Sequence, residues 1–163
     1  MEAQVLGTIA DLADLTIDTT QLSSQQLKAQ FVDRVLDHDS SNINLLVRSF
    51  GFKYGVPVDA DFVFDLRCLP NPHWNPELRT LSGLDQPVMD YLQEQPMVNE
   101  MFEDISSILN RWVPRFEDNA RVYMTVAIGC TGGQHRSVYM AQRLAENLSR
   151  EYSNVLVRHR ELN

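Results

Sequence analysis

Lysine and cysteine are scarce in this sequence, and long apolar runs are absent from it. Lys28 and Lys53 are the only lysines among 14 basic residues, so arginine carries nearly all the positive charge. Two cysteines, Cys68 and Cys130, are too few for a disulfide framework and favour a reduced compartment. The sequence contains no run of about 18 apolar residues, which is the length needed to cross a bilayer. Residues 1–10 lack the basic and apolar parts of a secretory signal. We therefore expect a cytoplasmic protein with no membrane segment.

The composition is that of an ordinary folded domain. The 163 residues are 44% hydrophobic, which is enough to bury a core. The net charge of −8 argues against a surface coated in basic residues. The charge is uneven, however, because residues 129–163 carry a net charge of +2 and residues 1–128 a net charge of −10.

Strands and helices alternate along the second part of the chain. Strands are expected at 43–50, 61–68, 121–128 and 154–158, and helices at 86–95, 97–113 and 135–152. Three prolines in 69–76 predict a rigid loop with neither helix nor ladder, and Pro114 is expected to end the second helix. The alternation predicts an α/β layered fold with a largely parallel sheet.

The first part of the chain is expected to be a separate unit. Residues 14–18 resemble a strand end, and an apolar pattern from Leu27 to Leu36 predicts a helix capped by Ser23 or Ser24. Residues 38–42 are polar and turn-rich. We therefore divide the chain into 1–42 and 43–163.

The segment Ile128–Ser137, IGCTGGQHRS, is the clearest motif. It follows a buried strand and opens a helix, where unpaired backbone N–H groups favour an anion, above all phosphate. Gly132 and Gly133 allow close approach of a ligand, and Arg136 offers a two-pronged contact. Thr131 and Ser137 add hydroxyl donors, and His135 adds a charge when protonated. No Walker-type lysine follows the glycines, so nucleotide binding by this loop is not expected.

Two other chemistries remain open for these residues. Cys130, Gly133, Arg136 and Ser137 fit the C-x-x-G-x-x-R-S loop of cysteine-dependent phosphatases, in which Cys130 would be the nucleophile beside Arg136. No compelling general acid accompanies them, so a small buried cysteine is the simpler interpretation. Cys68 with His73 and Cys130 with His135 have zinc-compatible ligands at non-standard spacing, and we expect no metal.

A second polar cluster follows the strand expected at 61–68. Asp65 and Arg67 project from one face near the carboxyl end of that strand, where ligands of open α/β sheets bind. Asn71 and His73 follow on the proline-rich loop. These four residues suit a ligand with hydroxyl or ammonium groups, although a surface ion pair with a capping Asn71 explains them too.

A third feature is a row of arginines on the last expected helix. Arg136, Arg143 and Arg150 recur every seven residues and therefore share a stripe, which Arg158, His159 and Arg160 continue in sequence. Such a stripe could follow a nucleic-acid backbone. On physical grounds alone, a solvated helix face is the simpler reading.

Three motifs together resemble one family. FDLRCLPNPHW (64–74), LRTLSGLD (78–85) and IGCTGGQHRSVYMAQRLA (128–145) closely resemble the C-terminal domain of the RapZ family of RNase adapter proteins, including YvcJ-like proteins. Residues 11–37 resemble the tail of the family's N-terminal P-loop ATPase domain. The Walker A segment of that domain is missing here, so this chain is expected to be a fragment that does not bind ATP and needs no cofactor.

The resemblance implies a binding domain rather than an enzyme. It implies sensing of glucosamine-6-phosphate, binding of small regulatory RNA, presentation of that RNA to RNase E to control amino-sugar synthesis, and assembly into a homo-oligomer. The sugar-phosphate site would include Asp65, Arg67, Asn71, His73, Thr131, Gly132, Gly133, Gln134, His135, Arg136 and Ser137. RNA would contact Arg143, Arg150, Arg158, His159 and Arg160. Unlike enterobacterial members, the chain carries no lysine/arginine-rich tail, so sugar-phosphate binding is better supported than RNA binding.

Overall fold

A computed structural model describes residues 43–119 and 121–162. They belong to one of two compact units of the chain, Asn42–Asn163. The strand end expected at 14–18, the helix expected around Leu27 to Leu36 and the linker at 38–42 lie outside the described residues.

Four parallel strands form one sheet, in the order β2-β3-β1-β4. The strands are β1 (Asn44–Gly51), β2 (Phe62–Asp65), β3 (Tyr123–Cys130) and β4 (Val155–His159). The two inner strands, β1 and β3, are almost wholly buried, as expected for the centre of a parallel sheet. The predicted α/β class with a parallel sheet is confirmed.

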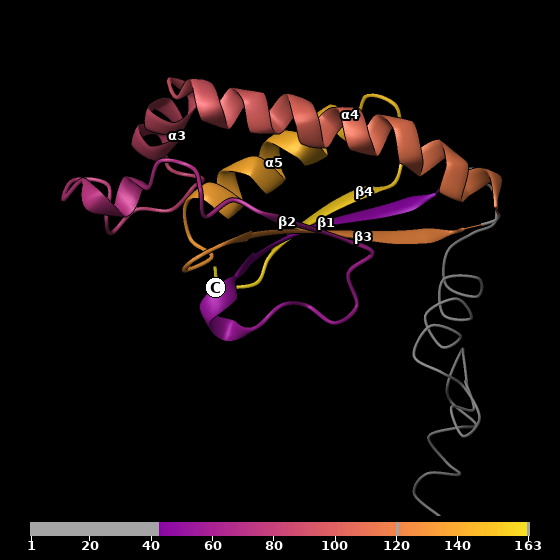
Figure 1. Cartoon of the computed structure of the whole chain (residues 1–163), viewed down its shortest axis with the longest axis horizontal. Coiled ribbons are helices and arrows are strands. Elements are labelled where there is room, and N and C mark those ends of the chain that lie inside the picture. The colour runs from indigo at the N-terminus through magenta and orange to yellow at the C-terminus, as the bar shows by residue number, and fades with distance from the viewer. Residues whose placement is uncertain (1–42, 120, 163) are drawn as a thin grey trace, which may run out of the picture. The chain divides into compact units, whose positions relative to one another are not determined.

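The three α-helices of the described residues cover one face of the sheet (Figure 1). They are α3 (Gln86–Gln93), α4 (Pro96–Asp118) and α5 (Arg136–Leu148). Right-handed crossovers explain the arrangement, because the connection from β1 to β2 crosses the sheet in the direction opposite to the later connections. That first connection, which includes the 3-10 helix η1 (Phe52–Tyr54), therefore passes over the other face.

The prediction that Pro114 ends the second helix is wrong. Helix α4 continues through it to Asp118. Pro114 lies on an exposed position, so its missing N–H disturbs only the solvent side of the helix. Beyond it, Phe116 packs against the core and the Glu117 Oε1 accepts the Ile43 N–H at 3.0 Å. These two contacts favour the extra turn.

Two details around β2 also differ from expectation. The strand ends at Asp65 rather than at Cys68, because Asp65 Oδ1 accepts the Arg67 N–H at 2.9 Å and turns the chain. The following loop is not free of helix, since Pro72–Trp74 forms one 3-10 turn, η2. Proline fits the first position of such a turn, and Asn71 caps it by accepting the His73 N–H.

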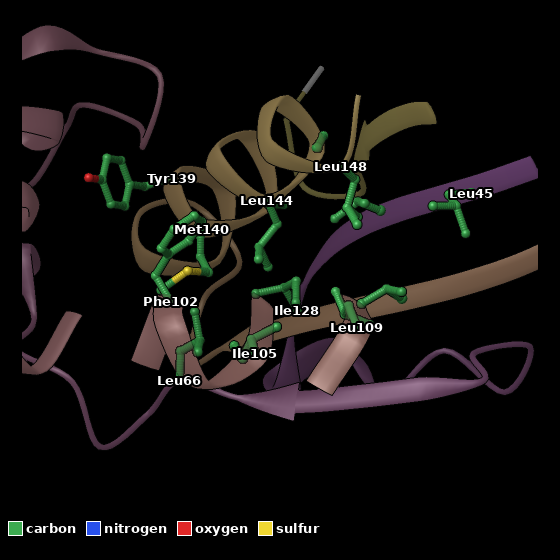
Figure 2. Close-up of a cluster of buried hydrophobic side chains, with 14 of the residues drawn as sticks. Leu45, Leu66, Phe102, Ile105, Leu109, Ile128, Tyr139, Met140, Leu144 and Leu148 are labelled. Atoms are coloured by element: carbon green, nitrogen blue, oxygen red, sulfur yellow. The ribbon is translucent and has the colours of Figure 1, made fainter. Parts of the chain in front are cut away.

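The core lies between the sheet and the helices (Figure 2). Leu45 from β1 and Ile128 from β3 face Ile105 and Leu109 from α4 and Leu144 from α5. Each such side chain stabilises the fold by roughly 2 kcal/mol when fully buried. Six side chains of α5 and of the turn that follows it are buried on the core side: Val138, Ala141, Leu144, Ala145, Leu148 and Tyr152.

Candidate ligand site

The candidate site lies at the carboxyl edge of the sheet. Because the strands are parallel, the loops that follow β1, β2 and β3 leave from this edge. The crossovers from β1 and from β3 run in opposite directions, and the crevice between such strands is where open α/β sheets bind ligands. Two segments dominate this edge: the glycine loop, residues 131–135, and the proline loop, residues 66–76.

Close backbone packing holds the glycine loop. A Cβ on Gly51, at the end of β1, would lie 2.7 Å from the Gly132 carbonyl carbon. Gly133 has a φ of 74°, which favours glycine, and a Cβ there would lie 2.7 Å from the Gly51 nitrogen. Gly132 differs, because nothing lies within 4 Å of its Cβ position. The loop is therefore tightly fitted at Gly133 and open beside Gly132.

Cys130 anchors the loop from inside. Its Sγ accepts the Gly133 N–H at 3.2 Å and lies 3.1 Å from the Ser137 Oγ. Cys130 is 3% exposed and Ser137 is fully buried. The thiol thus serves as an acceptor that shapes the turn, which suits the small-buried-residue interpretation of Cys130. Ser137, expected to be a ligand donor, is placed beneath the loop.

Arg136, the first residue of α5, points its guanidinium at the proline loop. Its Nη1 donates to the carbonyl oxygens of Leu66 at 3.4 Å, Arg67 at 3.1 Å and Leu69 at 2.9 Å. Its Nη2 lies 3.4 Å from the Thr131 Oγ1, and the residue is 4% exposed. Arg136 therefore ties the two loops together, with much of its hydrogen-bonding capacity already used by the protein.

Asp65 and Arg67 form an exposed, two-pronged ion pair. Arg67 Nη2 lies 2.6 Å from Asp65 Oδ2, and Arg67 Nε lies 3.0 Å from Asp65 Oδ1. Hydrogen bonding to Arg67 holds the pKa of the Asp65 carboxyl below its usual value. The Arg67 guanidinium also stacks over the Phe52 ring at 4.0 Å. The pair presents both signs of charge at the same place.

A contact between two histidine rings also joins the proline loop to the glycine loop. The rings of His73 and His135 lie 6.3 Å apart, and His135 Nε2 lies 3.2 Å from the Leu78 carbonyl oxygen. Burial is the main reason that the pKa of His135 is lowered. His135 is therefore neutral at neutral pH, and the extra positive charge expected from it arises only in acid. His73 and Gln134 are exposed.

Sequence reasoning missed two segments that complete the site. Gly83 packs on the first turn of α5, and its N–H donates to the Gln134 carbonyl at 2.8 Å. The LRTLSGLD motif contains Gly83, so the family motif was a signal for this contact. Glu161, by contrast, contacts Gly133 without any motif that could have identified it.

The basic residues do not form one stripe. Arg136 is buried, and Arg143 stacks over the Phe102 ring at 3.9 Å while donating to Asn99 Oδ1 at 2.7 Å. Arg150 and Arg158 are exposed. The remaining two candidates have partners within the protein, since His159 Nδ1 lies 3.0 Å from Ser49 Oγ and Arg160 pairs with Glu161.

Residues 43–119 and 121–162 contain neither a cluster of metal ligands nor a membrane-spanning helix. No group of three or more His, Cys, Asp or Glu side chains there is arranged to hold a metal ion, so the four residues of the zinc alternative do not gather. No helix in the same residues is long and apolar enough to cross a membrane.

Comparison with known proteins identifies relatives of this chain. It is 58% identical over 162 residues to a "Nucleotide-binding protein" of Pseudomonas putida. The aligned region covers 99% of this chain and 57% of the relative. It is 58% identical over 161 residues to a protein of the same description from Pseudomonas fluorescens, covering 99% and 56%. The chain thus spans a little more than half the length of these relatives.

The family comparison covers the part of the chain that carries the site. Residues 43–163 match the family described as the RapZ C-terminal domain. This range contains the glycine loop, the proline loop and the Gly83 segment. The chain belongs to the RapZ C-terminal domain family.

Proposed function

We propose that this domain binds a phosphorylated amino sugar, with glucosamine-6-phosphate as the expected compound. The observation that carries the proposal is the meeting of the glycine and proline loops, which Arg136 ties together through four contacts. One loop offers a helix N-terminus for a phosphate, and the other offers side chains for sugar hydroxyl and amino groups. Neither loop alone supplies both.

The open space beside Gly132 supports a division of roles. There the start of α5 and the Thr131 hydroxyl face the phosphate, and Arg136 contributes charge from behind the loop. On the proline loop, Asp65 accepts from an ammonium or hydroxyl group, and Arg67 exchanges part of its pairing with Asp65 for the phosphate. Asn71 and His73 complete the sugar side.

The sharpest test is calorimetric titration of the wild-type chain and Gly132→Ala with glucosamine-6-phosphate. The added methyl enters open space, so the fold persists while the ligand's approach to the loop is blocked. We expect saturable binding by wild type and at least a tenfold loss of affinity in the variant. A steric misfit that costs about 1.4 kcal/mol of binding free energy raises the dissociation constant tenfold. Glucosamine and inorganic phosphate serve as control ligands. No binding by folded wild type would reject the proposal.

We also propose, from the family resemblance, that the domain serves an RNase adapter that binds small regulatory RNA and presents it to RNase E. Exposed Arg150 and Arg158 support a contact with phosphates. We further propose that sugar phosphate and RNA affect each other's binding to the domain, and such coupling must be reciprocal. Filter binding of RNA with and without saturating sugar phosphate tests this coupling. Equal RNA affinity in both conditions would reject coupling.

Two further assignments follow from the same family. We assign the nucleotide in the relatives' description to the part of those longer proteins that this chain does not span. We also propose self-association through this domain, and exposed Val63 and Leu156 offer it apolar surface. Light scattering on the purified chain tests it, and a monomer at all concentrations would contradict it.

A further inference from the structure

The carboxylate of Glu161 is an unusual neighbour for an anion-binding loop. Its side chain is only 9% exposed, and its Oε2 is buried with no hydrogen-bond partner among the described residues. That oxygen lies against Gly133, close enough to collide with a Cβ at that position. In the described residues Arg136 Nε is also buried without a partner, so two such atoms of opposite charge flank one loop.

Arg160 fixes the position of this carboxylate. The Arg160 N–H continues the pairing beyond β4 by donating to the Ser49 carbonyl at 3.1 Å, and its Nη2 donates to the Gly51 carbonyl at 3.1 Å. Arg160 Nε then donates to Glu161 Oε1 at 2.6 Å. One carboxylate oxygen is thus hydrogen-bonded to Arg160, and the other keeps its acceptor capacity beside the loop.

We infer that Glu161 makes the site select its ligand by charge, disfavouring plain phosphate esters and favouring esters that also carry an ammonium group. The inference rests on the proposed function, because it concerns the same ligand. A buried carboxylate repels a phosphate dianion held at the neighbouring loop. An ammonium group on the ligand offsets that repulsion, because it is attracted to the same carboxylate.

The test compares glucosamine-6-phosphate with glucose-6-phosphate, which differ by one ammonium group in place of a hydroxyl. Both are titrated into the wild-type chain, Glu161→Gln and Glu161→Asp. Glu151→Gln makes the same charge change at an exposed position remote from the loop and is the matched control. Glu161→Met, which keeps the side-chain size, replaces the glutamine variant if that variant does not fold.

We expect wild type to prefer the amino sugar. Removing the charge in Glu161→Gln should raise affinity for glucose-6-phosphate by about fivefold and reduce the preference by at least the same factor. Glu161→Asp and Glu151→Gln should keep the preference. An unchanged preference in a folded neutral variant would overturn the inference.

A failure of the proposed function is distinguishable from a failure of this inference. If wild type binds neither sugar phosphate, the proposed function fails, and inorganic phosphate becomes the probe. A gain of phosphate affinity in Glu161→Gln then supports the charge role of Glu161. No gain relative to Glu151→Gln overturns it.

Discussion

The glycine loop and the proline loop leave the same edge of the sheet but are held in opposite ways. Backbone contacts with Gly51 and the buried Cys130 thiol fix the glycine loop. The proline loop instead begins at the exposed Asp65–Arg67 pair, and the buried Arg136 guanidinium holds it by donating to its carbonyl oxygens. The comparison indicates that the first loop supplies fixed geometry and the second supplies adjustable charge.

The largest expected effect separates two adjacent glycines of the first loop. Gly133→Ala should destabilise the fold by roughly 3 kcal/mol, because a Cβ at positive φ collides with the Gly51 nitrogen. Gly132→Ala should change stability by less than about 1 kcal/mol, since its Cβ meets nothing. Urea unfolding monitored by circular dichroism measures both. Equal destabilisation by the two variants would contradict the account of this loop.

The next effect concerns the arginine that joins the loops. Arg136→Met should lower the unfolding free energy by about 2 kcal/mol, because it leaves buried carbonyl oxygens of the proline loop without donors. Its loss of ligand binding would therefore not distinguish a contact from a misplaced loop. Chemical denaturation gives the magnitude, and a variant as stable as wild type would show that Arg136 is not the tie between the loops.

Arg67→Met is the matched substitution on the exposed side. Its ion pair with Asp65 is open to solvent, so the unfolding midpoint should not change. Ligand affinity should instead fall by about tenfold, since a charge-assisted contact with the phosphate is lost. Calorimetry and denaturation on the same sample separate the two effects. A loss of stability without a loss of affinity would reverse the roles assigned to the loops.

The smallest expected effect is the pH dependence of stability that His135 contributes. Burial lowers its pKa in the folded state, so the unfolded chain binds more protons as the pH falls below about 6.5. Stability should therefore decline as the pH falls below about 6.5, and His135→Asn should reduce the slope. Burial also lowers the pKa of His159, so part of the slope should remain in the His135 variant. Unfolding midpoints across this range measure the slope, and a stability that rises in acid would contradict the assignment.

The sequence predicted the parallel sheet and the two loops because both leave strong local signals. Apolar runs identify inner strands, and glycines after a strand identify a turn into a helix. It did not predict that α4 passes through Pro114, since the contacts of Phe116 and Glu117 are tertiary.

The roles of individual charged side chains were the least accessible from sequence. Arg136 and Arg143 share a helical stripe in sequence, yet one is buried against carbonyl oxygens and the other stacks on Phe102. Spacing gives the face of a helix but not the neighbours that cover it. Glu161 belongs to no motif, and only the fold brings it to Gly133.

The most direct test of a single site shared by both loops is amide chemical-shift mapping by NMR during a titration with glucosamine-6-phosphate. The account predicts that the largest shifts fall together on residues 131–136 of the glycine loop and helix start and on residues 65–73 after β2, with one common dissociation constant. Shifts confined to one loop, or centred on the exposed Arg150 and Arg158, would contradict it.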